Sequence, residues 1–423
     1  MNINKIIKNK NIFFYLLLFI LFAFLLWRIN LSSDMPRENQ SADSNKLINE
    51  DMTNEDVPRD IELAEDFEDE NQDSAKKSAK DMLDSILKVV GIKSSDSQKE
   101  KEEEPNTPPA IVPVSLQETM AWIYPGVPAC DAMQELADGR KIDIVKVEYF
   151  RVQSGGEMIF LNETNHGCNA YSEENLSFIK TYSKGQYVNV AAADAQDMNA
   201  FIIEDLASGK HSQTLVDFVV ANDFIGVELD FEDFGSWDKN IYDNYKAFVS
   251  QLGNKLRQQG KKLMIDGPAT ANSSEENWFV WRYADFISLP VDYIVVMAYD
   301  HQFDHGVGTP VAPLAWIEEV VQFTLSRFRD NNRLVIGLPS YGYRGQINTM
   351  NKTILTYQQA SQYPGFENAQ RDELSGEMTW THNNYQYFYQ DVTSLDLKIN
   401  TVLKQGIGRI SIWHLGGNQW TSL

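Results

Sequence analysis

Residues 226–234 read GVELDFEDF, in which apolar and acidic residues alternate. This period of two predicts a strand with one buried face. The two faces are Ile225, Val227, Leu229 and Phe231 on the apolar side, and Gly226, Glu228, Asp230 and Glu232 on the other. We therefore expect a file of carboxylates, spaced about 7 Å apart, along one side of the strand.

Other short apolar runs lie between residues 114 and 423, and helical patterns separate most of them. Including the acidic strand, the predicted strands are residues 120–124, 142–150, 187–193, 225–232, 262–266, 293–299, 334–338 and 409–414. The helical patterns include residues 197–222, 242–259 and 314–329. Strands that alternate with helices predict parallel βαβ units, and eight such units favour a (β/α)8 TIM barrel. A doubly wound open sheet is the competing fold, but no Gly-rich phosphate loop follows an early strand.

Residues 1–28 combine a lysine-containing start with an uncharged apolar run over residues 11–27. Roughly 17 apolar residues are the short end of a membrane-spanning helix, and the flanking charges place the N-terminus in the cytoplasm. We therefore expect a single-pass cell-membrane anchor with the C-terminal domain outside the cytoplasm. A cleaved signal peptide is the alternative, but no small-residue cleavage site follows the run.

Residues 29–113 are acidic and poor in aromatic residues, which predicts a disordered linker before a folded domain at 114–423. One apolar helical face between residues 82 and 90 is typical of a transient helix, a partner-binding helix or a membrane-lying helix. The formal net charge of the chain is −23. This charge argues against nucleic-acid binding, because no basic surface is available to neutralise phosphates.

In a barrel, the acidic face of the strand over residues 225–232 would point inward. Glu232 would then be the last inward residue at the carboxyl end of the strand, where barrel active sites lie. Like charges in a low-dielectric interior keep protons on some of the groups, and Asp230 would raise the proton affinity of Glu232. A carboxylic acid that stays protonated near neutral pH is suited to general-acid catalysis. A solvated edge strand or a divalent-cation site is the alternative interpretation.

The stretch GVELDFE resembles the acidic fourth-strand signature D-G-x-D-x-D-x-E of the glycoside hydrolase family 18 chitinases and their relatives. Ile225 and Glu228 depart from that signature. Residues 297–300 (MAYD) resemble the family's sixth-strand M-x-Y-D, residues 337–342 (GLPSYG) its seventh-strand G-L-P-x-Y-G, and Trp413 its eighth-strand tryptophan. Residues 191–194 (AAAD) replace the S-x-G-G of chitinases. This replacement, together with residues 146–151, is similar to the bacterial spore-wall and cell-wall branch.

The resemblance implies a retaining, substrate-assisted glycosidase, one of the exceptions to the two-carboxylate scheme. It implies that Glu232 is the general acid and base, that Asp230 binds the acetamido N–H of the substrate, and that Tyr299 binds the acetamido oxygen. The further substrate-binding residues that it implies are Glu228, Met297, Asp300, Tyr341 and Trp413. The expected substrate is a polysaccharide that contains N-acetylglucosamine, of the chitin or peptidoglycan type.

Two other function classes stay open at this point. The changed Ile225 and Glu228 suit a weakly active or inactive chitinase-like carbohydrate-binding protein, a lectin. An acidic linker that engages partners suits a wall-anchored scaffold. Hydrolysis that depends on Glu232 would separate the enzyme from both.

The cysteine and histidine residues give weaker signals. Cys130 and Cys168 either pair in an oxidising compartment or are separate small buried residues. His301, His305 and His414 fall at predicted strand ends, but the glycines after His305 favour a loop over a metal site. We expect neither a metal nor a cofactor.

Overall fold

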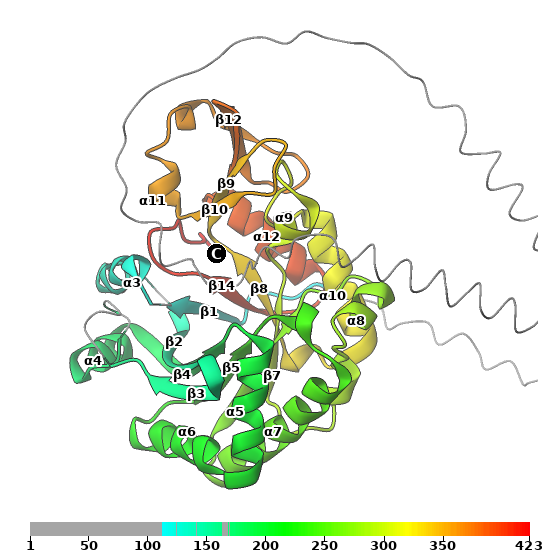
Figure 1. Ribbon diagram of the computed structural model, residues 1–423. Helices are drawn as coiled ribbons and strands as arrows, with labels where there is room; N and C mark the ends of the chain where they lie inside the picture. The colour runs from blue at the N-terminus through cyan, green and yellow to red at the C-terminus, as the bar shows by residue number, and fades with distance from the viewer. Residues whose placement is uncertain (1–111, 124, 141, 163–167, 169) are drawn as a thin grey trace, which may run out of the picture. The chain divides into compact units, whose positions relative to one another are not determined.

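The computed structural model describes residues 112–423, except residues 124, 141, 163–167 and 169 (Figure 1). The expected anchor at residues 1–28 and nearly all of the expected linker lie outside the described residues. The domain boundaries at residues 28 and 113 therefore stay predictions. Among the described helices, none has the length and apolar character needed to span a bilayer.

Eight parallel strands close into a barrel, because the first strand pairs with both the last and the second. The barrel strands are β1 (Glu118–Ile123), β2 (Ile142–Gln153), β4 (Ser183–Ala192), β5 (Gly226–Phe231), β6 (Lys262–Pro268), β7 (Tyr293–Met297), β8 (Leu334–Pro339) and β14 (Arg409–Trp413). Each predicted strand overlaps one of these, which confirms the (β/α)8 barrel over the open sheet. The acidic strand β5 lies between β4 and β6, so the edge-strand interpretation is wrong.

Helices surround the barrel, as Figure 1 shows. The described helices are α3 (Val127–Ala137), α4 (Glu173–Tyr182), α5 (Ala195–Ser208), α6 (Lys210–Ala221), α7 (Lys239–Gln258), α8 (Ser273–Trp278), α9 (His301–His305), α10 (Leu314–Phe328), α11 (Tyr357–Ala360) and α12 (Val392–Lys404), of which α11 packs on an inserted sheet rather than on the barrel. The single helix predicted over residues 197–222 is wrong, since α5 and α6 are separate. Gly209 lies between them with a φ of 68°, a left-handed conformation that ends helices and that glycine adopts without a steric cost.

The apolar face of β5 packs mostly as predicted. Val227, Leu229 and Phe231 are fully buried in the core between strands and helices. The Phe231 ring stacks on that of Phe248 in α7, with centroids 6.2 Å apart. Ile225 departs from the expectation because it precedes the first residue of β5. It packs instead on the smaller apolar cluster that includes Met120, Tyr187 and Met264.

A second, antiparallel sheet is inserted between β8 and α12, and Figure 1 shows it beyond one end of the barrel. Its strands are β9 (Gly342–Gln346), β10 (Lys352–Leu355), β11 (Gln370–Arg371), β12 (Met378–His382) and β13 (Tyr385–Tyr389). Its aromatic residues pack locally: the Trp380 and Tyr387 rings are buried and stacked 4.1 Å apart. One further strand, β3 (Glu157–Phe160), pairs antiparallel with β2.

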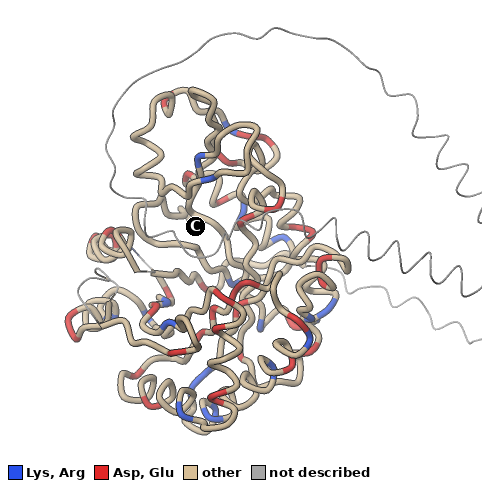
Figure 2. Tube along the Cα trace, in the orientation of Figure 1, with Lys and Arg blue, Asp and Glu red and all other residues tan. Residues whose placement is uncertain are grey.

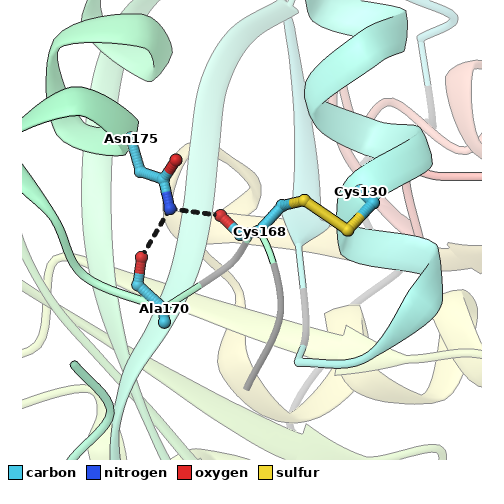
Figure 3. The surroundings of a disulfide bond; sticks show 4 residues. All are labelled: Cys130, Cys168, Ala170 and Asn175. Atoms are coloured by element: carbon cyan, nitrogen blue, oxygen red, sulfur yellow. Dashed lines mark hydrogen bonds between the residues drawn. A yellow bond between two sulfur atoms is a disulfide. The ribbon is translucent and has the colours of Figure 1, made fainter. Parts of the chain in front are cut away.

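The two cysteines form a disulfide (Figure 3). Cys130 in α3 is joined to Cys168, which is 38 positions away in the sequence. The side-chain amide of Asn175 donates to the carbonyls of Cys168 and Ala170 at 2.5 and 2.7 Å and so orders the chain beside the disulfide. The structure therefore selects pairing from the two alternatives that the sequence left open.

Replacing both cysteines with serine should lower the free energy of unfolding by about 3–4 kcal/mol, because the loop closed by the disulfide gains conformational freedom in the unfolded chain. Guanidinium unfolding under non-reducing conditions measures this loss. Adding reductant to the wild-type protein is the matched control and should produce the same shift. Equal midpoints for the variant and the oxidised wild type would contradict the disulfide.

Candidate active site

The carboxylates of β5 become more exposed toward the carboxyl end of the strand. Glu228 is fully buried, Asp230 is partly exposed, and Glu232 is exposed just past the last strand residue. The Glu232 N–H donates to the Ala192 carbonyl at 2.9 Å, which carries the pairing with β4 to the mouth of the barrel. Figure 2 shows acidic positions along the strands at the centre of the barrel. The predicted inward file of carboxylates is present.

A buried lysine pairs with the innermost of these carboxylates. Lys146 of β2 has no exposed surface, and its ammonium group forms an ion pair with Glu228. That ammonium lies 3.2 Å from the centroid of the Trp122 ring. The Asn189 side-chain amide donates to the other Glu228 oxygen at 3.0 Å. Glu228, which the sequence predicts to bind substrate, is enclosed by these partners and has no exposed surface.

The electrostatics of the file favour protonated acids at its outer end. Burial and then repulsion from Glu228 raise the pKa of Asp230 to about 6, while Asn189 and Lys146 limit that rise. Burial, followed by repulsion from Asp230 and Asp300, raises the pKa of Glu232 well above its usual range. Water reaches the exposed Glu232 side chain, so solvent screening moderates this effect. Glu232 is therefore suited to deliver a proton near neutral pH.

Aromatic rings converge on the same end of the barrel. The Trp122 ring meets the Tyr299 ring edge-to-face at 6.4 Å and the Trp413 ring at 5.9 Å. The Tyr299 ring also meets that of Tyr341 at 6.4 Å. Burial, and then repulsion from Asp230 among other acids, raises the pKa of the Tyr299 hydroxyl, which therefore stays a hydrogen-bond donor. The sequence predicted Tyr299 and Trp413 together but missed Trp122.

The remaining predicted residues surround Asp300. This residue follows β7 with a φ of 67°, and its carboxylate accepts a hydrogen bond from the buried Tyr341 hydroxyl. The Gln302 amide donates to the same oxygen at 3.3 Å. Met297 is nearly buried at the end of β7. Tyr341 therefore orients the Asp300 carboxylate through a hydrogen bond, while its ring packs near Tyr299 and Trp413.

A β-bulge in β2 lies beside a further acid of the site, Glu148, which repels Glu232. The register between β2 and β4 shifts between Glu148 and Phe150, which places Arg151 on the same side as Glu148. The Arg151 side chain donates to the Glu148 carboxylate at 2.6 Å. Burial raises the pKa of Glu148 to about 7, although Arg151 opposes the shift. The sequence signal for this pair was the charge within an otherwise apolar strand, the same signal that marked β5.

The histidines do not gather into a site with the carboxylates. The rings of His301 and His305 stack 3.8 Å apart, and burial with repulsion from His305 lowers the pKa of His301 to about 4. His414 is buried elsewhere. Within the part of the chain that the structure describes, no three potential metal ligands cluster together.

Comparison with known proteins agrees with this geometry. The family model "Glycosyl hydrolases family 18" matches residues 182–418, more than half of the chain. The uncharacterized glycosylase YvbX of Bacillus subtilis is 25% identical over 260 residues, which cover 56% of this chain and 71% of that protein. The cortical fragment-lytic enzyme of B. subtilis is 20% identical over 214 residues, covering 46% of this chain and 47% of that protein. Among solved structures, a chitinase from Chromobacterium violaceum has the same fold, with a TM-score of 0.59, 20% identity, and coverage of 71% of this chain and 95% of that chain.

Replacing Asp230 with asparagine should stabilise the fold at pH 8. The pKa of this carboxyl is about 6 in the folded protein, against an ordinary 3.8. The folded state therefore binds more protons than the unfolded state between about pH 4 and 6, and stability falls as the pH rises through that window. This difference in pKa corresponds to about 3 kcal/mol, and because Asp230 is partly exposed, solvent screening should reduce the gain on removing the charge to about 1–2 kcal/mol at pH 8, with little gain at pH 3.

Chemical unfolding of wild type and variant at both pH values measures the difference. Asp217→Asn removes an exposed acid on α6 and is the matched control, for which we expect no such gain. An Asp230→Asn variant that is no more stable than wild type at pH 8 would show that Asp230 carries no burial cost.

Proposed function

The chain belongs to glycosyl hydrolases family 18 and is a glycoside hydrolase, and we propose that it cleaves β-linked polysaccharide containing N-acetylglucosamine with Glu232 as general acid and base. The observation that carries this proposal is the position of Glu232. Glu232 is an exposed residue just past the end of β5 in a closed barrel, and its carboxyl interacts electrostatically with Asp230 and Tyr299. Those are the parts that acid-catalysed cleavage of an acetal requires.

The proposed reaction is retaining and uses the substrate's own acetamido group. The protonated Glu232 carboxyl gives its proton to the glycosidic oxygen as the bond to the anomeric carbon breaks. The acetamido oxygen attacks that carbon and forms an oxazolinium ion. The Glu232 carboxylate then takes a proton from water as the water opens the ring, which restores the starting configuration and the protonated acid.

Neighbouring side chains orient the acetamido group in this proposal. The Asp230 carboxylate accepts a hydrogen bond from its N–H and stabilises the positive charge of the oxazolinium ion. The Tyr299 hydroxyl donates to its oxygen and holds it against the reacting carbon, which lowers the entropy cost of attack. Trp413 supplies an apolar floor for the sugar ring, and Asp300, oriented by Tyr341, binds a sugar hydroxyl.

We propose a cell-wall glycan of the peptidoglycan type, or chitin, as the polymer. One similar protein is named as a cortical fragment-lytic enzyme and another as a chitinase, and both names fit a polymer with acetamido sugars. The proposed place of action is outside the cytoplasm, on a membrane anchor formed by residues 1–28. The disulfide between Cys130 and Cys168 supports that location, because such bonds persist in oxidising compartments.

A carbohydrate-binding protein with little or no turnover is the second candidate. The observation in its favour is the ion pair between Lys146 and Glu228, which occupies a residue that departs from the family signature. In this alternative, Glu232 and Trp413 bind the glycan but the site does not complete the cleavage.

Glu232→Gln should reduce hydrolysis by about 10²–10⁴-fold, because glutamine cannot donate the proton. The assay uses the full-length protein and fluorescently labelled chitin and peptidoglycan oligomers, with product release followed by chromatography. Asp233→Asn is the matched control, because this neighbouring acid is also exposed and asparagine tolerates its left-handed backbone (φ 56°). Tight binding without turnover by the wild type would favour the lectin, and hydrolysis that survives in Glu232→Gln would overturn the role of Glu232.

Glu148→Gln should move the alkaline limb of the pH–rate profile to lower pH. The ionised Glu148 repels Glu232 and contributes to its raised pKa, so without that charge Glu232 loses its proton at lower pH. The pKa of Glu148 is about 7, and its repulsion therefore acts above that pH, whereas the acid limb should stay in place. The measurement is kcat against pH for wild type, Glu148→Gln and the exposed control Glu157→Gln. An unchanged alkaline limb in Glu148→Gln would contradict the coupling.

A further inference from the structure

Asp266 of β6 is a buried acid that the family signature does not include. It has no exposed surface. The β5–β6 register pairs Leu229 with Ile265, so Asp230 and Asp266 follow next to each other on neighbouring strands. Neither carboxylate oxygen of Asp266 accepts a hydrogen bond from a described residue. A buried carboxyl beside other carboxylates, without a donor, is expected to keep a proton.

The charges around Asp266 support that protonation. Burial and repulsion from Glu228 and Asp230 raise the pKa of Asp266 well above its usual range, and Lys146 alone among the named causes opposes the shift. The Lys146 ammonium is already paired with Glu228. Asp266 also interacts electrostatically with the hydroxyl groups of Tyr245, Tyr283 and Tyr299. These hydroxyls are neutral hydrogen-bond donors rather than cations. The described residues therefore give Asp266 no free positive charge.

A proton on Asp266 converts the crowded carboxylates into a hydrogen-bonded set. A hydrogen bond to Glu228 is among the causes that raise the pKa of Asp266, and a hydrogen bond from Asp266 is among the causes that hold down the pKa of Asp230. Lys146 donates to one oxygen of the Glu228 carboxylate and Asn189 to the other. The Asn189 amide nitrogen lies 3.4 Å from the Asp230 carboxylate. A hydrogen bond of that length is weak, so a shorter hydrogen bond from Asp266 would fix the Asp230 carboxylate more strongly.

We propose that Asp266 is a positioning residue that carries a proton in the resting enzyme and donates it in a hydrogen bond to Asp230, while Lys146 keeps Glu228 engaged below. One side of the Asp230 carboxylate is thereby fixed, and the other side is left for the acetamido N–H of the substrate. No proton is transferred in this arrangement, so the charge on Asp230 during cleavage is unchanged. This inference rests on the proposed function for its effect on the reaction, but the protonation of Asp266 does not.

Three variants of Asp266 separate orientation from packing. Asp266→Asn keeps an N–H donor at the same place, Asp266→Leu fills the volume without a donor, and Asp266→Ala removes both. We expect kcat for Asp266→Asn to stay within about threefold of wild type, since the donor is retained. For Asp266→Leu and Asp266→Ala, we expect kcat to fall about 10²-fold with KM changed less than threefold, because misplacing a reacting group acts on the chemical step.

The second measurement does not depend on activity. The infrared spectrum of the full-length wild-type protein near pH 7 should contain the carbonyl band of the protonated Asp266 carboxyl group. Subtracting the spectrum of Asp266→Asn should reveal this band, because the variant lacks it. The band should remain in Asp285→Asn, the control for a partly exposed acid paired with Lys246. If the wild type hydrolyses no glycan, the proposed function fails while this band still tests the proton on Asp266.

Two results would overturn the inference. One is a spectrum in which Asp266→Asn removes no protonated-carboxyl band. The other is a loss of kcat in Asp266→Asn as large as in Asp266→Leu, with both variants folded to the same melting temperature. Retained turnover in Asp266→Asn together with the lost band supports it.

Discussion

The ion pair between Lys146 and Glu228 is the interaction on which the site depends. Both side chains are fully buried, and removing two charges from water costs several kcal/mol for each ion. The Trp122 ring beneath the ammonium and the Asn189 amide beside the carboxylate supply the further contacts that such a pair needs. Losing one partner would leave an uncompensated charge inside the barrel, directly below the reacting groups.

The exposure of the carboxylates increases along β5, from the buried Glu228, whose charge Lys146 neutralises, to Glu232, which water can reach. Asp230 lies between the two, near enough to Glu228 and Glu232 to be repelled by both. Closure of the barrel produces this gradient, because a ring of paired strands has no edge through which solvent could hydrate the inner acids. Burial and repulsion between neighbouring acids therefore raise the pKa values of Asp230 and Glu232 at the outer end of the file.

The two departures from the family signature also acquire physical explanations. Ile225 precedes β5 and packs on the apolar cluster that includes Met120 and Met264. Glu228 is one methylene longer than aspartate, and its carboxylate meets the Lys146 ammonium on β2. A substitution that looks unfavourable in one strand is thus matched by a residue on another.

Local periodicity in the sequence was enough to predict part of this structure. Alternation identified β5 and the inward direction of Glu232, and eight apolar runs predicted a closed barrel, because side-chain direction in a strand follows from position alone. The residues that contact those carboxylates could not be predicted from the sequence. Lys146 is 82 positions from Glu228, and Asp266 is a single acid on another strand. The barrel register brings these residues together, and register is a tertiary property that depends on how strands pair rather than on the composition of any one of them.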